Sequence, residues 1–199
     1  LSVPLQSGVQ LLPTLFRDFK NLYPEIELEV VEAGGIDSLR MIENEELDLA
    51  VTNYDDSFSP NLHYRKLFKS EACFCTYPDH PLAQKKYVDT KDIANEPLVL
   101  LNGGFFVNRL IYQNFQQALT APKVILHSSQ LHTVKNLISS QIASSFLMRQ
   151  AITASDNIIP LSLKKPLFIN SGIVTKRGRQ IYGDEQQLIE IICDNQPFG

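Results

Sequence analysis

The chain has 199 residues, of which 44% are hydrophobic and 20% charged, and its formal net charge is −4. This is ordinary for a globular chain that builds a real core, and the length suits one large domain or two small ones. Lys and Arg do not cluster with aromatic residues, and no apolar run approaches the roughly 18 residues of a membrane helix. The chain itself is therefore a poor candidate for binding nucleic acid or for crossing a membrane.

The first third of the chain alternates between the apolar periodicities of helices and of strands. Apolar residues recur at steps of three and four from Val9 to Leu22, as on one face of a helix, and Pro24 ends that pattern. Glu25–Val30 then alternates acidic and apolar residues, as a strand with one buried face does. Strands that alternate with helices predict an α/β domain with a parallel sheet. Pro13 lies early in the first predicted helix, so either that helix starts near Leu12 or its first turn is bent. The elements predicted here are strands over residues 1–6, 25–30 and 47–52, a helix over 9–22, and a second helix that Asp37 or Ser38 caps and whose inner face carries Leu39 and Ile42.

The alternation of predicted strands and helices is interrupted at Pro78–Pro81, where two prolines end a strand, and it resumes after that segment. Gly178 is predicted to turn the chain, and Asp184 to cap the last helix. The long strand from Leu167 is well placed to return the chain to the first set of elements, so we predict two similar α/β lobes, crossed by two strands, with a cleft between them. Strands are predicted over residues 62–67, 71–77, 97–101, 124–127, 142–148, 158–161 and 167–176, and helices with the inner residues Phe106, Leu110, Phe115 and Leu119, then Leu131, Val134, Leu137 and Ile138, then Leu188, Ile189 and Ile192.

Candidate binding residues follow from the places where strands end and helices begin, because ligands of parallel sheets bind there. Helix N-termini present unpaired N–H groups and partial positive charge, so several that converge can hold a carboxylate or a similar anion. The simpler alternatives are helix capping for each serine, loop chemistry for the segments that leave strands, and a core position for the phenylalanine. The candidates at these places are Ser7, Gly8, Val9, Gly35, Ile36, Asn53, Asn102, Gly103, Phe105, Ser128, Ser129 and Gln130. Phe168 is a further candidate, because it lies near the strand that returns the chain to the first set of elements.

The sequence carries no recognisable catalytic or metal-binding constellation. Cys73, Cys75 and Cys193 form neither a disulfide framework nor a Cys-x-x-Cys motif, which favours a reducing cytoplasm. The first two lie in a strand-like run and are predicted to be buried, since a redox-sensing role requires a loop and a resolving spacing that they lack. The four His residues have no carboxylate or Cys at metal-ligand spacing, and no nucleophile elbow or triad is present. We therefore predict no metal, no cofactor and no enzymatic activity.

Several segments, in order, resemble the effector-binding domain of LysR-type transcriptional regulators. Leu12–Phe19 followed by Tyr23–Leu28 is similar to the family's leucine–proline helix, which ends in tyrosine–proline before an alternating strand. Glu46–Val51 is similar to the family's strand after an acidic helix. The most specific signature is Tyr77–Ala83 with Asp92–Val99 behind it. Together these matches span almost the whole chain.

The resemblance implies a type 2 periplasmic-binding-protein-like fold, in which two Rossmann-like lobes are joined by two crossover strands and hold the effector between them. Lobe I is expected to comprise residues 1–73 and 163–199, and lobe II residues 74–162. The family also has an N-terminal winged helix-turn-helix and a linker helix, neither of which is in this sequence. Because the chain begins on a predicted strand, without Met, charged leader or signal peptide, we expect it to be mature or cut from a longer protein.

The predicted function is that of a regulatory domain that senses a small, anionic effector. Binding favours one lobe arrangement, and a dimer or tetramer passes that bias to the DNA-binding domains of the longer protein. The outward apolar faces of the first lobe's helices are the expected contact between subunits. The alternative is a solute-binding receptor of a transport system, which has the same fold and a signal peptide.

One segment departs from the pattern of the family. Gln141 and Met148 stand where the family usually has Gly and Pro. A Gln in a left-handed helix cap is less favourable than a Gly, because its Cβ is strained there. Ser145, which lies between these two positions, is the last candidate effector contact.

Overall fold

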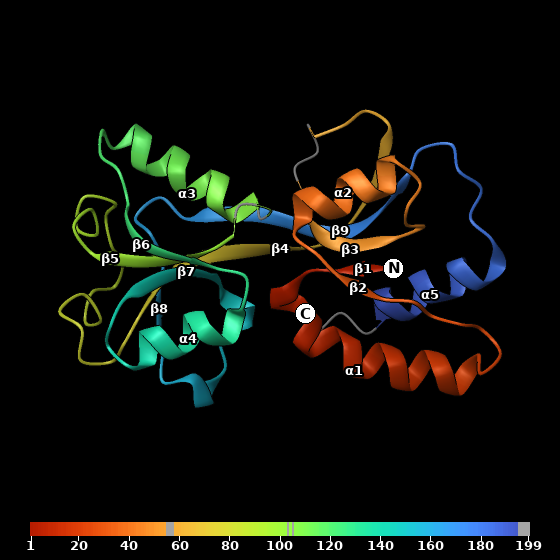
Figure 1. Ribbon diagram of the computed structural model, residues 1–199, viewed down its shortest axis with the longest axis horizontal. Coiled ribbons are helices and arrows are strands. Elements are labelled where there is room, and N and C mark those ends of the chain that lie inside the picture. The colour runs from red at the N-terminus through yellow and green to blue at the C-terminus, as the bar shows by residue number, and fades with distance from the viewer. Residues whose placement is uncertain (55–57, 103, 105, 195–199) are drawn as a thin grey trace. The chain divides into compact units, whose positions relative to one another are not determined.

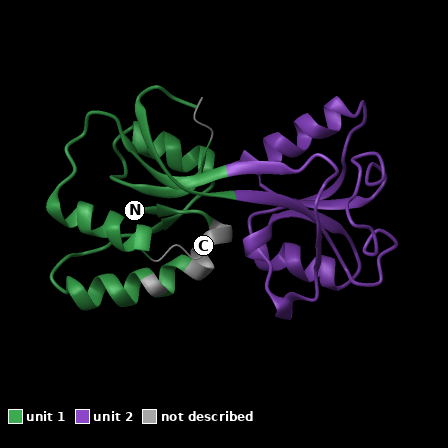
Figure 2. Ribbon diagram, turned by 180° about the vertical axis from the view of Figure 1, so that it is seen from behind, with its two compact units in different colours: residues 1–69, 170–199 green, residues 70–169 purple. Residues whose placement is uncertain are grey.

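The computed structural model describes residues 1–54, 58–102, 104 and 106–194, and for residues 5–10 and 14 it describes the backbone only. The chain divides into two compact units (Figure 2). Unit 1 comprises residues 1–69 and 170–199, and unit 2 comprises residues 70–169. The chain passes from one unit to the other within β4 (Leu62–Thr76) and again within β9 (Leu167–Lys176).

Unit 1 is built on a mixed sheet with the strand order β2-β1-β3-β9 (Figure 1). β1 pairs in parallel with both β2 and β3, whereas β9 runs antiparallel to β3. The core is formed by the inner faces of α1 and α5 against this sheet, with Leu15, Phe19 and Ile189 almost fully buried. The elements are β1 (Ser2–Val3), α1 (Leu5–Leu22), β2 (Val31–Glu32), α2 (Gly35–Glu43), β3 (Ala50–Tyr54) and α5 (Gly183–Asp194).

Unit 2 has the strand order β4-β7-β5-β6, and β8 pairs with β4 outside that path. β5 is parallel to both β6 and β7, and β4 is antiparallel to β7 and β8. Phe74, Phe115 and Phe146 pack edge to face in its core. The remaining elements are β5 (Pro97–Leu101), α3 (Phe106–Gln117), β6 (Lys123–Ser128), α4 (Leu131–Ser139), β7 (Ser144–Met148), the 3-10 turns η1 (Arg149–Ala151) and η2 (Ala154–Asp156), and β8 (Ile159–Leu161).

Much of the predicted secondary structure is confirmed. The strands predicted over 97–101 and 167–176 have those same bounds. Leu39 and Ile42 are fully buried on the inner face of α2, and the three residues predicted inside the last helix are buried in α5. Gln141 has φ 61°, so a left-handed residue does end α4 although it is not glycine.

The predicted start of the first helix is wrong. α1 begins at Leu5 with Pro4 as its N-cap, and β1 is only two residues long. The fixed φ of proline suits this position, and its missing N–H removes one of the donors that a helix start leaves unpaired. Ser7, Gly8 and Val9 therefore lie within the first turns of α1, and not in a strand exit before it.

Other predictions from periodicity also need correction. Glu25–Val30 is not a strand, because the ladder with β1 is formed by Val31 and Glu32 alone. The apolar residues of that segment still pack against the core while its glutamates are exposed, so the alternation predicted the burial but not the pairing. Leu119, predicted to be inside, is 96% exposed with φ 56°, because the chain leaves α3 at that residue.

The predicted side-chain caps are wrong as well. Gly34 is the N-cap of α2 and Gln130 that of α4, and neither supplies a side-chain hydrogen bond. Ser38, predicted as a cap, is buried within α2, where its hydroxyl lies 2.6 Å from that of Ser2. This contact ties α2 to β1 and so positions the start of the helix at the end of the sheet.

Helix α4 is tied to η2 by an ion pair between Lys135 Nζ and Asp156 Oδ2, 2.7 Å apart. Burial opposes the charge of Asp156, but hydrogen bonds from Lys135 and from Thr153 outweigh it and hold the pKa of that carboxyl below its usual value. Replacing Asp156 with Asn should therefore lower the free energy of unfolding by about 1–2 kcal/mol at neutral pH. Urea unfolding measures this, with the exposed Asp79→Asn as the matched control.

The same pair predicts a pH dependence. Because the pKa of Asp156 is lower in the folded state, its contribution is complete above the unfolded-state value and is lost as pH falls through the folded-state value. The difference between the native chain and the Asn variant should thus shrink when the pH is lowered from about 6 to about 3. A difference that stays constant over that range would contradict a role for the charge.

Candidate functional site

In unit 1, two neighbouring parallel strands lead directly into two helices. Pro4 follows β1 and caps α1, while Gly34 follows β2 and caps α2 with an extended backbone (φ −67°, ψ 154°). Neither cap supplies a side-chain acceptor, so the N–H groups of the first turns are left for another partner. The backbones of Ser7 and of Gly35 and Ile36 thus lie in two helix starts at the carboxyl edge of one sheet.

Asn53 is the last residue but one of β3, the strand that pairs with β1 in the same sheet. Its side chain is buried, and its Oδ1 accepts a hydrogen bond from Ser171 Oγ at 2.5 Å. The ring of the next residue, Tyr54, stacks on Tyr64 with a centroid distance of 4.8 Å. With Oδ1 engaged, Nδ2 is the remaining hydrogen-bond donor of the Asn53 side chain.

In unit 2, the structure brings four of the candidates together. Leu101 at the end of β5 is in register with Ser128 at the end of β6, and Asn102 N–H donates to Ser128 O at 2.9 Å. Ser128 Oγ accepts the N–H of Gln130 at 3.1 Å, which shapes the turn into α4. Ser129 and Gln130 are exposed, so this helix start is open at the carboxyl edge of β5 and β6.

Asn108 contributes to this edge although the sequence did not distinguish it. It is buried in the first turn of α3, and its Nδ2 donates to Leu101 O at 2.6 Å and to Asn102 O at 3.1 Å. These two bonds fix the exit of β5 beside Ser128. In the sequence, an Asn inside an amphipathic helix pattern is indistinguishable from a surface residue, so only the fold identifies it.

The other candidates are placed differently. Ser145 lies inside β7, fully buried, with its hydroxyl donating to Val99 O at 2.5 Å. Phe168 is 46% exposed near the start of β9. Gly103 and Phe105 lie outside the described residues.

The two strand cysteines are buried, as predicted. Cys73 and Cys75 are free and fully inaccessible in β4. Burial raises the pKa of Cys73 to about 12 and also raises the pKa of Cys75. Since the thiolate is the reactive form, neither side chain is set up as a nucleophile.

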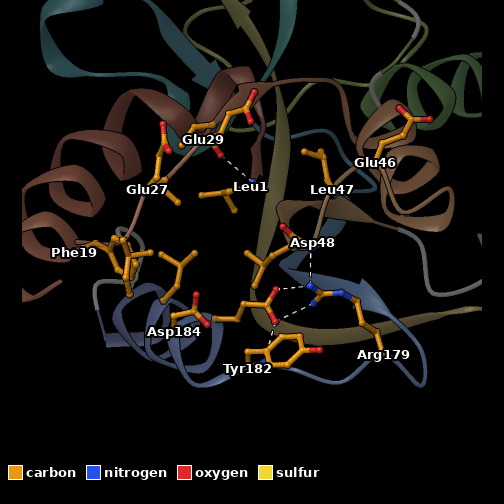
Figure 3. A pocket seen from close by; sticks show the side chains of 16 residues that line it. Leu1, Phe19, Glu27, Glu29, Glu46, Leu47, Asp48, Arg179, Tyr182 and Asp184 are labelled. Carbon is orange, nitrogen blue, oxygen red and sulfur yellow. Dashed lines mark hydrogen bonds and ion pairs between the residues drawn. The ribbon is translucent and has the colours of Figure 1, made fainter. Parts of the chain in front are cut away.

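A hollow of about 850 Å³ lies in unit 1 at the opposite, amino edge of the sheet, where Leu1 and Leu49 precede their strands. Figure 3 shows the side chains that line it. Arg179 lies in its wall and donates to Asp48 at 2.8 Å and to Glu185 at 3.0 Å. Its lining is apolar and acidic, and it contains none of the candidate residues. The described residues include neither a group of His, Cys, Asp and Glu that could hold a metal nor a helix long and apolar enough to span a membrane.

Solved structures of effector-binding and regulatory domains have the same fold as this chain. The effector-binding domain of QuiR in complex with shikimate has a TM-score of 0.81 at 18% identity and covers 97% of this chain and 93% of that one. The regulatory domain of CcmR from Synechocystis PCC6803, in complex with 2-PG, has a TM-score of 0.86 at 18% identity, covering 97% and 94%. The fold is therefore that of the effector-binding domains, which are like type 2 periplasmic binding proteins.

The family is also shown by sequence. The LysR substrate binding domain model matches residues 1–195. The transcriptional dual regulator GltC of Bacillus subtilis (strain 168) is 25% identical over 201 residues, covering 96% of this chain and 65% of GltC. The chain belongs to the LysR substrate binding domain family, which confirms the predicted resemblance. The chain spans less than two thirds of the length of this curated relative. The alternative function, a solute-binding receptor of a transport system, is not favoured, because these relatives are transcriptional regulators.

Proposed function

We propose that this chain is the sensing part of a longer cytoplasmic regulator that has no catalytic activity. A small effector binds to it and shifts the populations of its conformations, and a separate N-terminal domain of the same protein binds DNA. The family match and the regulator relatives support this proposal. The protein acts as a homodimer or tetramer, and α1 supplies a contact, since Phe16 and Leu22 are 42% and 62% exposed on it.

The effector is an anion, most simply a carboxylate. The observation that carries this proposal is the cluster at the end of β5 and β6, where Asn102, Ser128 and Gln130 surround the open start of α4. A helix start attracts negative charge, with a contribution of about 0.3–1 kcal/mol for an exposed group and more for a partly buried one. Within unit 1, the starts of α1 and α2, together with Asn53, offer donors of the same kind. Ligands bound to similar domains, shikimate and 2-PG, show that small molecules suit this fold.

A ligand screen tests the class of effector. Small carboxylates, amino acids, aromatic acids, neutral sugars and organic cations are added singly, and the melting temperature is measured. At least one carboxylate should raise it, because a ligand that binds only the folded state stabilises that state. A response to sugars or cations, with none to any anion, would contradict the proposal.

A matched pair of variants then tests the position of the site. Gln130→Glu adds a negative charge at the start of α4, whereas Gln141→Glu adds the same charge just beyond its end. The first should weaken binding of the carboxylate found in the screen about tenfold or more, while leaving the free energy of unfolding unchanged or higher, since acidic residues suit helix starts. The second should leave affinity near that of the native chain. Equal losses in both variants would indicate a general charge effect and not a site at Gln130.

A further inference from the structure

A second hollow lies in unit 2, away from the candidate effector site. Its volume is about 460 Å³, within the range of small-molecule sites. Three segments form its walls: the turn Asp89–Lys91, the last turn of α3 from Asn114 to Ala118, and Lys164 with Lys165. Because α3 starts at the carboxyl end of β5 and ends here, this hollow is at the amino edge of the sheet, opposite Ser128.

Hydrogen bonds join these walls to one another. Val88 N–H donates to Ser162 O at 3.0 Å, and Lys164 N–H donates to Val88 O at 2.8 Å, so the lysine segment is held beside the turn. The Thr90 hydroxyl, which is buried, donates to Asn114 Oδ1 and holds the same turn against α3. The hollow is therefore formed before any ligand arrives, and its side chains project from fixed backbone positions.

The charges around this hollow do not cancel. Asp92 pairs with Lys85 at 2.9 Å, and Asp89 lies 3.9 Å from Lys164. Among the described residues, no carboxylate pairs with the ammonium groups of Lys91 and Lys165, although both line the hollow. Two positive charges are thus left without a partner at one place on unit 2.

Neutral donors accompany these charges. Since Asn114 accepts the Thr90 hydroxyl with its Oδ1, its Nδ2 remains as a donor on the wall of the hollow. Gln117, one turn further along α3, adds a second amide. A ligand with several acceptor oxygens and two negative charges would satisfy both kinds of group. Lys is a common phosphate binder because its ammonium acts as a point charge that needs no planar partner.

We propose that this hollow is a second ligand site, which binds a small molecule carrying a dianionic phosphate group between Lys91 and Lys165. The inference does not depend on the effector proposed above, because the two sites lie at opposite edges of the sheet and share no residue. The second ligand would adjust the response of the domain from unit 2.

The test uses the full 199-residue chain, labelled with 15N, and inorganic phosphate at constant ionic strength. Amide signals of the three wall segments should move and saturate. Lys91→Gln with Lys165→Gln should weaken the phosphate affinity about tenfold or more. The control is Lys66→Gln with Lys123→Gln, which removes the same charge from two exposed residues outside the hollow and should retain the affinity.

Three results would overturn the proposal. Saturating changes at Asn102 and Ser128–Gln130 alone would place phosphate at the other edge of the sheet. Equal losses in the two double variants would show that phosphate responds only to net charge. An absence of saturable changes would show that no site exists. All four lysines are exposed, so their replacement should leave the fold intact. Unchanged spectra of the ligand-free variants will establish this for each comparison.

Discussion

Replacing Gly172 with Ala should lower the free energy of unfolding by about 3 kcal/mol or more, the upper end of what overpacking does. A Cβ built on Gly172 would lie 2.3 Å from Arg65 O and 3.0 Å from Lys66 Cα, both backbone atoms of β4. It would also lie 3.0 Å from a ring carbon of Tyr54. Backbone atoms cannot rotate away as the end of a side chain can, so β9 or β4 must move. The measurement is urea unfolding with a probe of each unit, because a chain with two units need not unfold in one step.

Two further glycines separate the causes of this effect. Gly178 has open space around its Cβ position but φ 78°, so Gly178→Ala should cost about 1 kcal/mol through backbone strain alone. Gly183 has neither a close neighbour nor a positive φ, and it begins α5, so Gly183→Ala should be neutral or slightly stabilising. If the change at position 172 is no worse than that at 178, the close approach of the two strands is not what requires glycine.

Replacing His80 with Ala should destabilise unit 2 by about 2–4 kcal/mol. The ring is 5% exposed, and its Nδ1 accepts the N–H of Leu82 at 3.1 Å. The proton must therefore be on Nε2, which lies 3.1 Å from Glu96 Oε2 and donates to it. The ring also packs edge to face on Tyr77, with centroids 4.9 Å apart. The alanine variant loses this packing and leaves two polar groups without their partner.

Conservative variants divide this effect between the two ring nitrogens. An Asn at position 80 places an acceptor near the position of Nδ1, and a Gln places a donor near the position of Nε2. His80→Asn should restore the bond from Leu82, and His80→Gln the bond to Glu96, so each should be more stable than His80→Ala. Equal stability of all three would show that the ring contributes packing only. Hydrogen exchange at Leu82 gives an independent measure, because that amide should be protected only in the native chain and the Asn variant.

The fold could be predicted where periodicity and breakers agree. Pro97–Leu101 and Leu167–Lys176 are apolar runs bounded by turn residues, and both strands have the predicted bounds. Prediction failed where a local signal was ambiguous. Pro4 is compatible both with a strand and with a helix cap, because the φ of proline suits both. The sequence pattern therefore did not show that α1 begins directly after Pro4. Leu119 fits the helical period, but α3 ends before it, and periodicity does not report where a helix stops.

The candidate site could be predicted in outline and not in detail. The open start of α4 follows from a strand that ends at Ser128 and a helix that begins after Gln130. The bonds of Asn108 could not be foreseen, since they join residues on two different elements. The hydroxyl of Ser145 was assigned to a ligand contact by resemblance, yet its donor is engaged by Val99. The effector contacts themselves stay predictions that the variants at Gln130 will test.

The two crossings of the chain also set an order of events during synthesis. Unit 2 is one continuous segment, whereas unit 1 closes only when β9 pairs with β3 and α5 packs onto α1. Domains fold as units while the chain leaves the ribosome from its N-terminus. Unit 2 can therefore fold before residues 170–199 have been made, and the apolar residues of unit 1 that pack against Ile189 stay exposed until those residues follow.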